Sequence, residues 1–226
     1  MGPHQVAQLE ELLPEYRSFG VGRKANLTGE GMVVFYKPSS IQPLETETFW
    51  LSETPDVPGS RSWGEGWIRC LAWGRFFHME SGRTFYFFNT HFDTKGEGVR
   101  LIEAQLIAEQ VAAITGDSPL FLVADFNSPG GESPTWKFFK EKGFKGARDI
   151  ALSDPKGSFG TWCGFKAPVE HSKRIDWILL KGNIQINGFE TINHHRNRRY
   201  PSDHFPIIAE AIINQSIHRR IDGKVD

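Results

Sequence analysis

An uninterrupted apolar run, LFLVA at positions 120–124, is the sequence feature that most constrains the fold. Prolines stand shortly before and after it, and a short apolar run bounded by turn residues predicts a fully buried strand. Asp125 and Asn127 follow at its carboxyl end. Because residues two apart in a strand point the same way, we expect their side chains to reach one place, where they could hold a water and a hard cation. A plain strand-to-turn junction is the alternative, since Asp, Asn, Ser, Pro and Gly all favour turns.

Length and composition predict one folded domain at residues 1–214, followed by a polar tail at 215–226. The chain has 226 residues, of which 39% are hydrophobic, enough for a packed core. Its net charge of −1 gives no overall basic field for nucleic acid, so any anion-binding site must be local. Two cysteines, Cys70 and Cys163, are too few for a disulfide framework. No apolar run approaches a membrane span, and the first residues do not begin a signal peptide.

The order of the expected elements predicts an α+β fold with sheets covered by helices. Apolar residues at helical spacing predict helices at 4–16, 97–114 and 133–142, with a short helix or turn at 148–152. Besides the buried strand above, strands are expected at 19–24, 32–36, 41–51, 67–78, 84–90, 174–180, 184–192 and 204–213.

Two further strands carry polar residues that suit phosphate or acid–base chemistry. His91 follows the strand at 84–90 within the sequence NTHFD, and a structural or exposed histidine is the alternative. In the strand at 174–180, Arg174 and Asp176 are expected on one face, opposite the apolar residues. Asp176 could orient a catalytic imidazole; an exposed ion pair of little energetic weight is the alternative.

The segment that enters the last strand, YPSDHFP at 200–206, contains adjacent Asp203 and His204. In an extended chain they would point to opposite sides, but a loop would let both reach one site. A basic run, HHRNRR at 194–199, lies just before it and would attract phosphate beside an acidic metal site. A proline-framed turn and a solvated loop are the alternatives.

Candidate residues at strand ends, in this order along the chain, are more specific together than any one of them alone. They lie in four short signatures: THF at 90–92, ADFN at 124–127, RID at 174–176 and SDH at 202–204. The chain resembles the metal-dependent endonuclease/exonuclease/phosphatase superfamily, the deoxyribonuclease-like phosphoesterases. FWLS at 49–52, GWIR at 66–69 and GTW at 160–162 are similar to its bacterial, deadenylase-related branch, and the resemblance covers nearly the whole chain.

The resemblance implies a four-layer α/β/β/α sandwich of two packed mixed sheets, and a role for each matching residue. Asp125 and Asn127 would position or deprotonate the attacking water and contact the phosphate. His91 would bind the phosphate, and Asp176 would orient His204, which would stabilise the pentacovalent phosphorus. The cofactor would be Mg²⁺, with Mn²⁺ as a substitute, because a hard cation with oxygen ligands polarises a phosphoryl oxygen.

The resemblance also implies the residues around this set. The metal ligands would be Asp203, Asp125 and Asn127. The substrate-binding residues would be Arg69, Glu30 and Arg174. Glu30 matches the carboxylate that pairs with His91 in the family. Cys163 stands where the bacterial branch has a histidine, so the resemblance assigns no role to that substrate-facing position.

The family pattern begins with two strands, one ending in Asn and one ending in Gln-Glu, whose Glu is a principal metal ligand. Here the sequence starts at the helix expected at 4–16, so we expect those strands and that ligand to be lacking. A misplaced start, a fragment and a protein that binds metal weakly are the explanations left open. The strand edges that the lacking strands would cover would then invite instability or association.

The sequence therefore predicts a metal-dependent hydrolase of ester bonds, a nuclease or phosphatase that cleaves a phosphodiester or phosphomonoester by water attack, with activity impaired by the missing ligand. The alternatives are a sugar-phosphate or lipid phosphatase and a non-catalytic phosphate-binding remnant. The expected partner is a phosphate-ester substrate, either nucleic acid or a small phosphorylated molecule. We expect a monomer without a membrane span, cytoplasmic for the chain as given, with an exported form open if the N-terminus is incomplete.

Overall fold

The computed structural model describes residues 1–64, 66–170 and 172–214, and the polar tail expected at 215–226 lies outside them. The helices are α1 (Pro3–Leu12), α2 (Glu97–Thr115), α3 (Pro134–Glu141) and α4 (Ala147–Ile150). The strands are β1 (Arg17–Phe19), β2 (Val34–Tyr36), β3 (Ile41–Trp50), β4 (Cys70–His78), β5 (Arg83–His91), β6 (Leu120–Asp125), β7 (Lys145–Gly146), β8 (Asp176–Lys181), β9 (Ile184–Thr191) and β10 (Ile207–Ile213).

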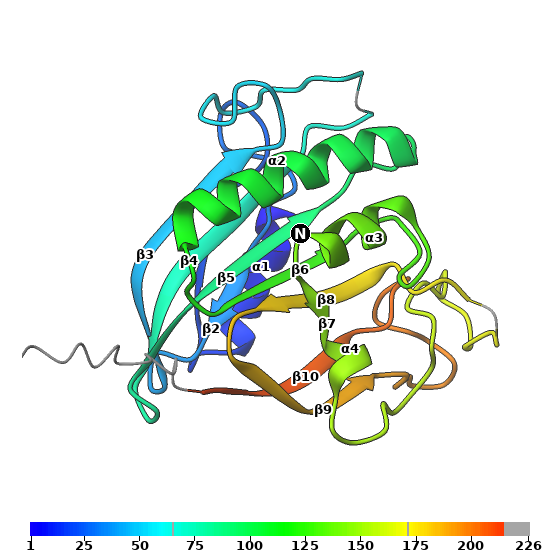
Figure 1. Ribbon diagram of the computed structural model, residues 1–226. Helices are drawn as coiled ribbons and strands as arrows, with labels where there is room; N and C mark the ends of the chain where they lie inside the picture. The colour runs from blue at the N-terminus through cyan, green and yellow to red at the C-terminus, as the bar shows by residue number, and fades with distance from the viewer. Residues whose placement is uncertain (65, 171, 215–226) are drawn as a thin grey trace, which may run out of the picture.

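A six-stranded sheet in the order β3-β4-β5-β6-β8-β7 forms the centre of the molecule (Figure 1). β5 and β6 are parallel, and α2 makes the long crossover that parallel neighbours require. The other neighbours in this sheet are antiparallel. The sheet is therefore mixed, as the family resemblance implied.

Strand β6 shows how the sequence separates the two faces of this sheet. Leu120 and Leu122 are buried in the core that α2 and α3 cover, where the rings of Phe126 and Trp177 stack at 4.0 Å. Phe121 instead packs toward β9 and β10 on the opposite face. Because side chains alternate along a strand, every second residue of β6 after Phe121 points away from α2 and α3.

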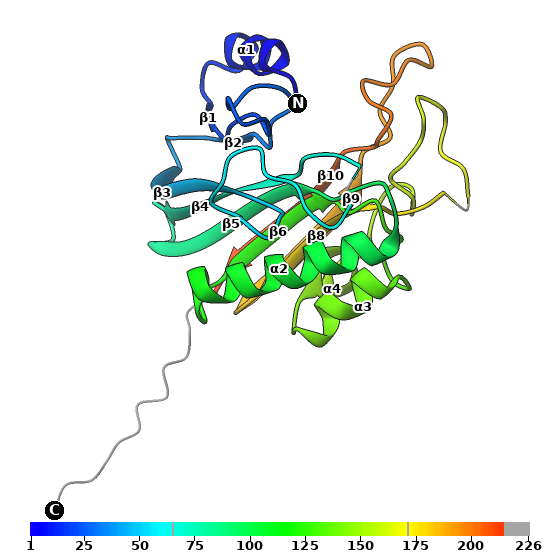
Figure 2. The same cartoon turned by 90° about the horizontal axis from the view of Figure 1, so that it is seen from above.

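Two antiparallel strand pairs, β9–β10 and β1–β2, cover the face opposite α2 and α3, and α1 lies outside β1–β2 (Figure 2). Phe189 of β9 belongs to the same core cluster as Phe121 of β6. On the other side, Phe19 and Tyr36 pack against Phe76 of β4. The layers follow the predicted order, but within the described residues the second layer is two separate pairs rather than one mixed sheet.

An open groove of about 670 Å³ lies between these two strand pairs. Phe85, Phe87 and Phe121 contribute to its apolar floor, while β2 and β10 line its sides. Within the described residues, β2 and β10 each have one neighbouring strand, so each presents an unpaired edge. Asp125 and Asp176 also line the groove. The groove therefore reaches the polar residues at the carboxyl end of β6. The expectation about further N-terminal strands stays a prediction.

Two strand boundaries differ from the expected ones in a way that bears on function. β8 begins at Asp176 and β10 at Ile207, so Arg174 and His204 lie outside the strands expected to contain them. The late start of β10 has a physical reason, because Pro206 has no N–H to give to a ladder. Among the helices of the described ranges, none combines the length and the apolar character needed to cross a bilayer.

Candidate active site

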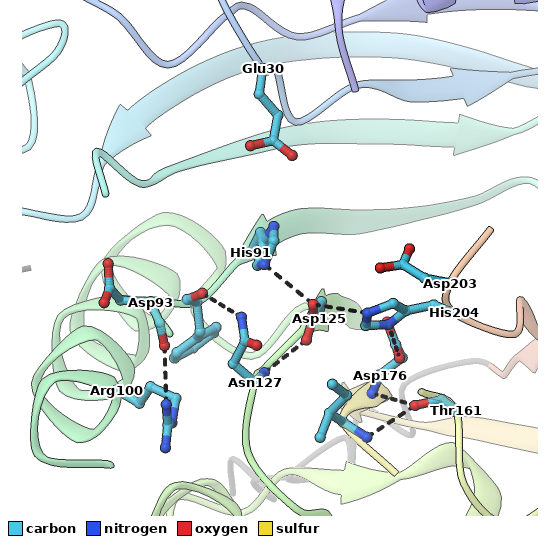
Figure 3. A network of polar contacts seen from close by, with 12 residues as sticks. Glu30, His91, Asp93, Arg100, Asp125, Asn127, Thr161, Asp176, Asp203 and His204 are labelled. Carbon is cyan, nitrogen blue, oxygen red and sulfur yellow. Dashed lines mark hydrogen bonds and ion pairs between the residues drawn. The ribbon is translucent and has the colours of Figure 1, made fainter. Parts of the chain in front are cut away.

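Three strands place three polar side chains in one row at one edge of the groove. His91 is in register with Asp125 across β5 and β6, and Asp125 is in register with Asp176 across β6 and β8. Residues in register across a sheet present their side chains on the same face, here the face away from α2 and α3. Figure 3 shows these side chains converging on Asp125. The structure thus brings together three of the predicted site residues.

His204 joins this row from the segment that leads into β10. Its Nδ1 lies 2.8 Å from Asp176 Oδ2, and its Nε2 lies 3.8 Å from Asp125 Oδ2 (Figure 3). The hydrogen bond with Asp176 raises the pKa of His204 to about 9; burial opposes this shift, and the charges of Asp176, Asp125 and Asp203 add to it. His204 is therefore an imidazolium at neutral pH, and both of its nitrogens are donors.

Asp125 stands at the centre of the cluster and accepts hydrogen bonds from both sides. His91 Nε2 lies 3.2 Å from its Oδ2, and the backbone N of Asn127 donates to its Oδ1 at 2.8 Å. Burial by itself would raise the pKa of Asp125, but the hydrogen bonds and the imidazole charges of His91 and His204 keep that pKa below its ordinary value. At neutral pH Asp125 is therefore a carboxylate and a weak base.

Asn127 reaches the site through a turn rather than through strand alternation. β6 ends at Asp125, and Asn127 has a φ of 49°, in the left-handed region that Asn tolerates better than most residues. Its Nδ2 donates to the carbonyl O of Phe92 at 2.9 Å. Its Oδ1 then remains an acceptor on the side of Asp125 (Figure 3). The two side chains meet as expected, but for a different geometric reason.

Single donor atoms of Asp125, Asp176 and His204 lie within 4.8 Å of one another, close enough to hold one ion. His204 Nδ1 is bonded to Asp176, so only its Nε2 could face an ion. A hard cation prefers oxygen ligands, and the carboxylate of Asp125 and the side-chain oxygen of Asn127 are the neighbouring candidates. Mg²⁺ keeps several waters and needs only one or two carboxylates, so two protein oxygens suffice. Asp203, the third expected ligand, lies beside His204 in Figure 3 but is not in this group of the described residues.

Comparison with known proteins identifies the family. The sequence profile of the Endonuclease/Exonuclease/phosphatase family matches residues 2–204. The chain belongs to this family. An endonuclease/exonuclease/phosphatase from Bacteroides vulgatus is 30% identical, with a TM-score of 0.88 over 94% of this chain and 82% of that one. A mannosyl-6-phosphatase from Bacteroides thetaiotaomicron is 31% identical, with a TM-score of 0.84 over 93% of this chain and 82% of that one.

Proteins with lower sequence identity also match this chain, but they do not indicate a more specific activity. TDP2 of D. rerio, solved with a single-strand DNA product, is 16% identical with a TM-score of 0.71, over 94% of this chain and 83% of that one. At that identity the likeness shows the fold alone. A protein of Acanthamoeba polyphaga mimivirus is 28% identical over 130 residues, 53% of this chain, and the match spans about half of the mimivirus protein, 47%. The family resemblance and the α+β fold predicted from sequence are confirmed.

Glu30 and Arg69, which the family resemblance gave as substrate-binding residues, do not contact the cluster around Asp125. Glu30 was expected to pair with His91, but its Oε2 lies 2.6 Å from Arg23 Nη1, and Figure 3 shows it apart from His91. Arg69 is buried at 3% exposure, and its Nε has no hydrogen-bond partner among the described residues. Burial, followed by the charge of Arg23, lowers the pKa of Arg69. Neither side chain joins the cluster around Asp125.

The prediction that Arg174 shares a face of the sheet with Asp176 is wrong. It is buried, with its guanidinium 4.9 Å from the Trp136 ring centre and its Nη1 3.3 Å from Asp149 Oδ1. Trp177 packs against that same Trp136 ring, so Arg174 lies on the helix side of the sheet. The alternation argument failed because β8 starts only at Asp176, two residues later.

Sequence reasoning missed two residues that hold the site in place. Thr161 is fully buried, and its Oγ1 accepts the backbone N–H groups of Ile175 and Asp176, both at 3.0 Å. Glu97, the first residue of α2, accepts from the Ser128 hydroxyl at 2.8 Å and so ties down the turn that follows the site asparagine. Thr161 lies in the GTW motif at 160–162. Glu97 could have been predicted to have a structural role, because an acidic residue at the start of a helix is stabilised by the helix dipole.

Proposed function

We propose that this chain is a phosphoesterase that depends on a divalent cation and hydrolyses a phosphate ester by attack of water. The observation that supports this is the convergence of His91, Asp125 and Asp176 from three strands with His204 from a loop. Phosphoryl transfer asks little covalent chemistry of a protein. It asks for positioning and for groups that cover developing negative charge. This cluster offers both.

The roles follow from the protonation state of each group. Asp125 and Asn127 would hold Mg²⁺, or Mn²⁺ as a substitute, and the ion supplies Lewis-acid polarisation when bound. Asp125 is ionised and accepts hydrogen bonds only, so it can orient a water. His204 is protonated and held through Nδ1, so its Nε2 can donate to a phosphoryl oxygen. His91, on the other side of Asp125, would bind the phosphate from there.

The substrate class to test first is a phosphomonoester of a small molecule. The Bacteroides thetaiotaomicron protein at 31% identity is a mannosyl-6-phosphatase, whereas the DNA complex belongs to a relative by fold alone. The net charge of −1 gives no overall basic field of the kind that attracts a nucleic-acid backbone. The basic run at 194–199 would supply local attraction for a phosphate. Faster cleavage of diesters than monoesters would point to a nuclease instead.

The test compares Asp125, the last residue of β6, with Asp117, which lies in the connection between α2 and β6. Asp125→Asn removes the central carboxylate, while Asp117→Asn changes an exposed aspartate just before the strand begins. Both variants and the wild type would be assayed on mannose 6-phosphate, nucleoside monophosphates and a short oligonucleotide, in EDTA and after adding Mg²⁺ or Mn²⁺. We expect kcat of Asp125→Asn to fall about a hundredfold or more, the scale at which one preorganised group contributes, and Asp117→Asn to match wild type.

Two outcomes would overturn the proposal. Equal turnover in EDTA and in Mg²⁺ would remove the cation from the reaction. Binding of phosphate esters without turnover at any Mg²⁺ or Mn²⁺ concentration would identify the non-catalytic remnant that the sequence left as an alternative.

A further inference from the structure

The loop between β9 and β10 carries positive charge with no acidic residue beside it in the sequence. From position 191 to position 202 the chain has three arginines and two histidines, and no aspartate or glutamate. All residues at 194–199 are exposed. Figure 2 shows this loop, drawn in orange, projecting beyond β9 and β10 toward the side of the central sheet where β1, β2 and α1 lie. The candidate active site faces that same side, away from α2 and α3.

A tight turn fixes the backbone of two of these arginines. Arg196 and Arg199 form an antiparallel bridge in which each backbone N–H donates to the carbonyl O of the other residue, at 3.1 and 2.9 Å. Between them, Asn197 and Arg198 have φ of 51° and 60°, the two left-handed residues of a tight hairpin turn. Opposed residues in an antiparallel pair present their side chains on one face. The side chains of Arg196 and Arg199 therefore leave the turn side by side.

The base of this turn is fastened to the residue next to His204. The rings of His195 and Tyr200 lie 5.2 Å apart, and the rings of Tyr200 and Phe205 lie 5.6 Å apart. Phe205 is buried and directly follows His204. Arg199 precedes His204 by five residues, so their Cα atoms are at most about 18 Å apart. The turn is therefore held at a limited distance from the candidate active site.

The two guanidinium groups have no acidic partner in the part of the chain that the structure describes. Neither Arg196 nor Arg199 forms an ion pair with a described carboxylate. Like charges directly opposite each other in a strand pair are unfavourable. An anion that accepts hydrogen bonds from both groups would remove this repulsion, and a phosphate group has enough oxygens for two forked contacts with arginine. The turn therefore offers a preformed place for a phosphate group.

We propose that Arg196 and Arg199 together bind a second phosphate group of the substrate, one that is not hydrolysed. This inference rests on the proposed function, because it assigns the hydrolysed phosphate to Asp125 and His204. The arginine pair would then distinguish a substrate with two or more phosphate groups from a simple monoester. The second phosphate group can come from a sugar bisphosphate or from the next nucleotide of a strand, and both sources have the same chemistry.

The experiment uses two pairs of substrates whose members differ in the additional phosphate. Mannose 6-phosphate is paired with mannose 1,6-bisphosphate, and thymidine 5′-monophosphate is paired with a short oligothymidylate that carries a 5′-phosphate. The double variant Arg196→Gln with Arg199→Gln removes the arginine pair. The double variant Lys137→Gln with Lys145→Gln removes the same charge from exposed residues of α3 and β7 and is the matched control.

We expect the wild type to show, in one of the two pairs, a kcat/KM about tenfold or more higher for the member with the additional phosphate, mainly through KM. This is the scale of a hydrogen bond between charged groups. The arginine double variant should lose most of that preference, and the lysine double variant should keep it. The pair that shows the effect identifies the source of the second phosphate. No preference in the wild type, an equal loss for both members of each pair, or the same loss in the lysine double variant would overturn the inference.

Binding is measured separately from turnover, by calorimetry in EDTA. Asp125→Asn, in which hydrolysis should be slow, is compared with the triple variant that adds Arg196→Gln and Arg199→Gln. A Kd about tenfold or more weaker in the triple variant for the bisphosphate or the oligothymidylate, with a smaller change for the monophosphates, supports the arginine pair even if no ester is hydrolysed. Equal Kd values in the two proteins would overturn it. Failure of the wild type to hydrolyse any ester counts against the proposed function alone.

Discussion

Replacing Asp176 by Asn tests whether this carboxylate and His204 act as one unit. The substitution keeps the size of the side chain but removes the negative charge 2.8 Å from His204 Nδ1. That hydrogen bond is the largest cause that raises the pKa of His204 to about 9. We expect the pKa of His204 in Asp176→Asn to return toward its ordinary value of 6.5.

The magnitude follows from the pKa. A rise from 6.5 to about 9 corresponds to about 3 kcal/mol in favour of the imidazolium in the folded state, since one pKa unit is about 1.4 kcal/mol. Because the folded-state pKa is raised, this stabilisation is complete below pH 6.5 and is lost as the pH rises through about 9. The free energy of unfolding of metal-free wild type should therefore fall by this amount across that window, and that of Asp176→Asn should fall much less.

The assay pairs NMR titration of the His204 ring with urea unfolding from pH 6 to pH 10, both in EDTA. Activity of Asp176→Asn, His204→Ala and the double variant then tests coupling, and we expect strongly non-additive losses because each partner acts through the other. A wild-type His204 that titrates near 6.5, or independent losses that multiply in the double variant, would refute the pairing.

Two further substitutions test the residues that support the site. Glu97→Ala should leave the buried Ser128 hydroxyl without its acceptor, cost about 1–3 kcal/mol of stability by urea unfolding and lower kcat, while exposed Glu109→Ala on the same helix should leave both unchanged. Thr161→Val keeps the shape but removes the acceptor for the backbone N–H of Asp176, so we expect a similar loss of stability and a lower kcat; an unchanged unfolding midpoint would contradict the assigned hydrogen bonds.

The sequence predicted best those features that depend on a local pattern of residues. The run at 120–124 identified a buried strand, and the strand ends identified His91, Asp125 and Asp176. What the pattern could not supply was the register. His91, Asp125 and Asp176 form a row because β6 pairs with β5 on one side and β8 on the other, and such pairings depend on contacts far apart in the chain.

The failures have a common physical cause, because each concerns a residue at or beyond an element boundary. Arg174 precedes β8, so strand alternation did not govern its direction. Glu30 lies in a loop, and its ion pair with Arg23 is a loop contact that no periodicity reveals. Asn127 does lie beside Asp125 as predicted, but it does so through a left-handed turn beyond the end of β6, a conformation that the sequence allows but does not specify.

Asp125 and Trp162 are held in place by different parts of the fold. Asp125 is fixed by the register of central strands, so moving it would disturb the core that lies behind β6. Trp162 is fixed by backbone hydrogen bonds to the segment that carries His204, while its ring stands in solvent. A change at Trp162 therefore leaves the packing of the sheet intact, and Trp162→Ala should have the same midpoint of urea unfolding as the wild type. A lowered midpoint would show that the indole supports the fold.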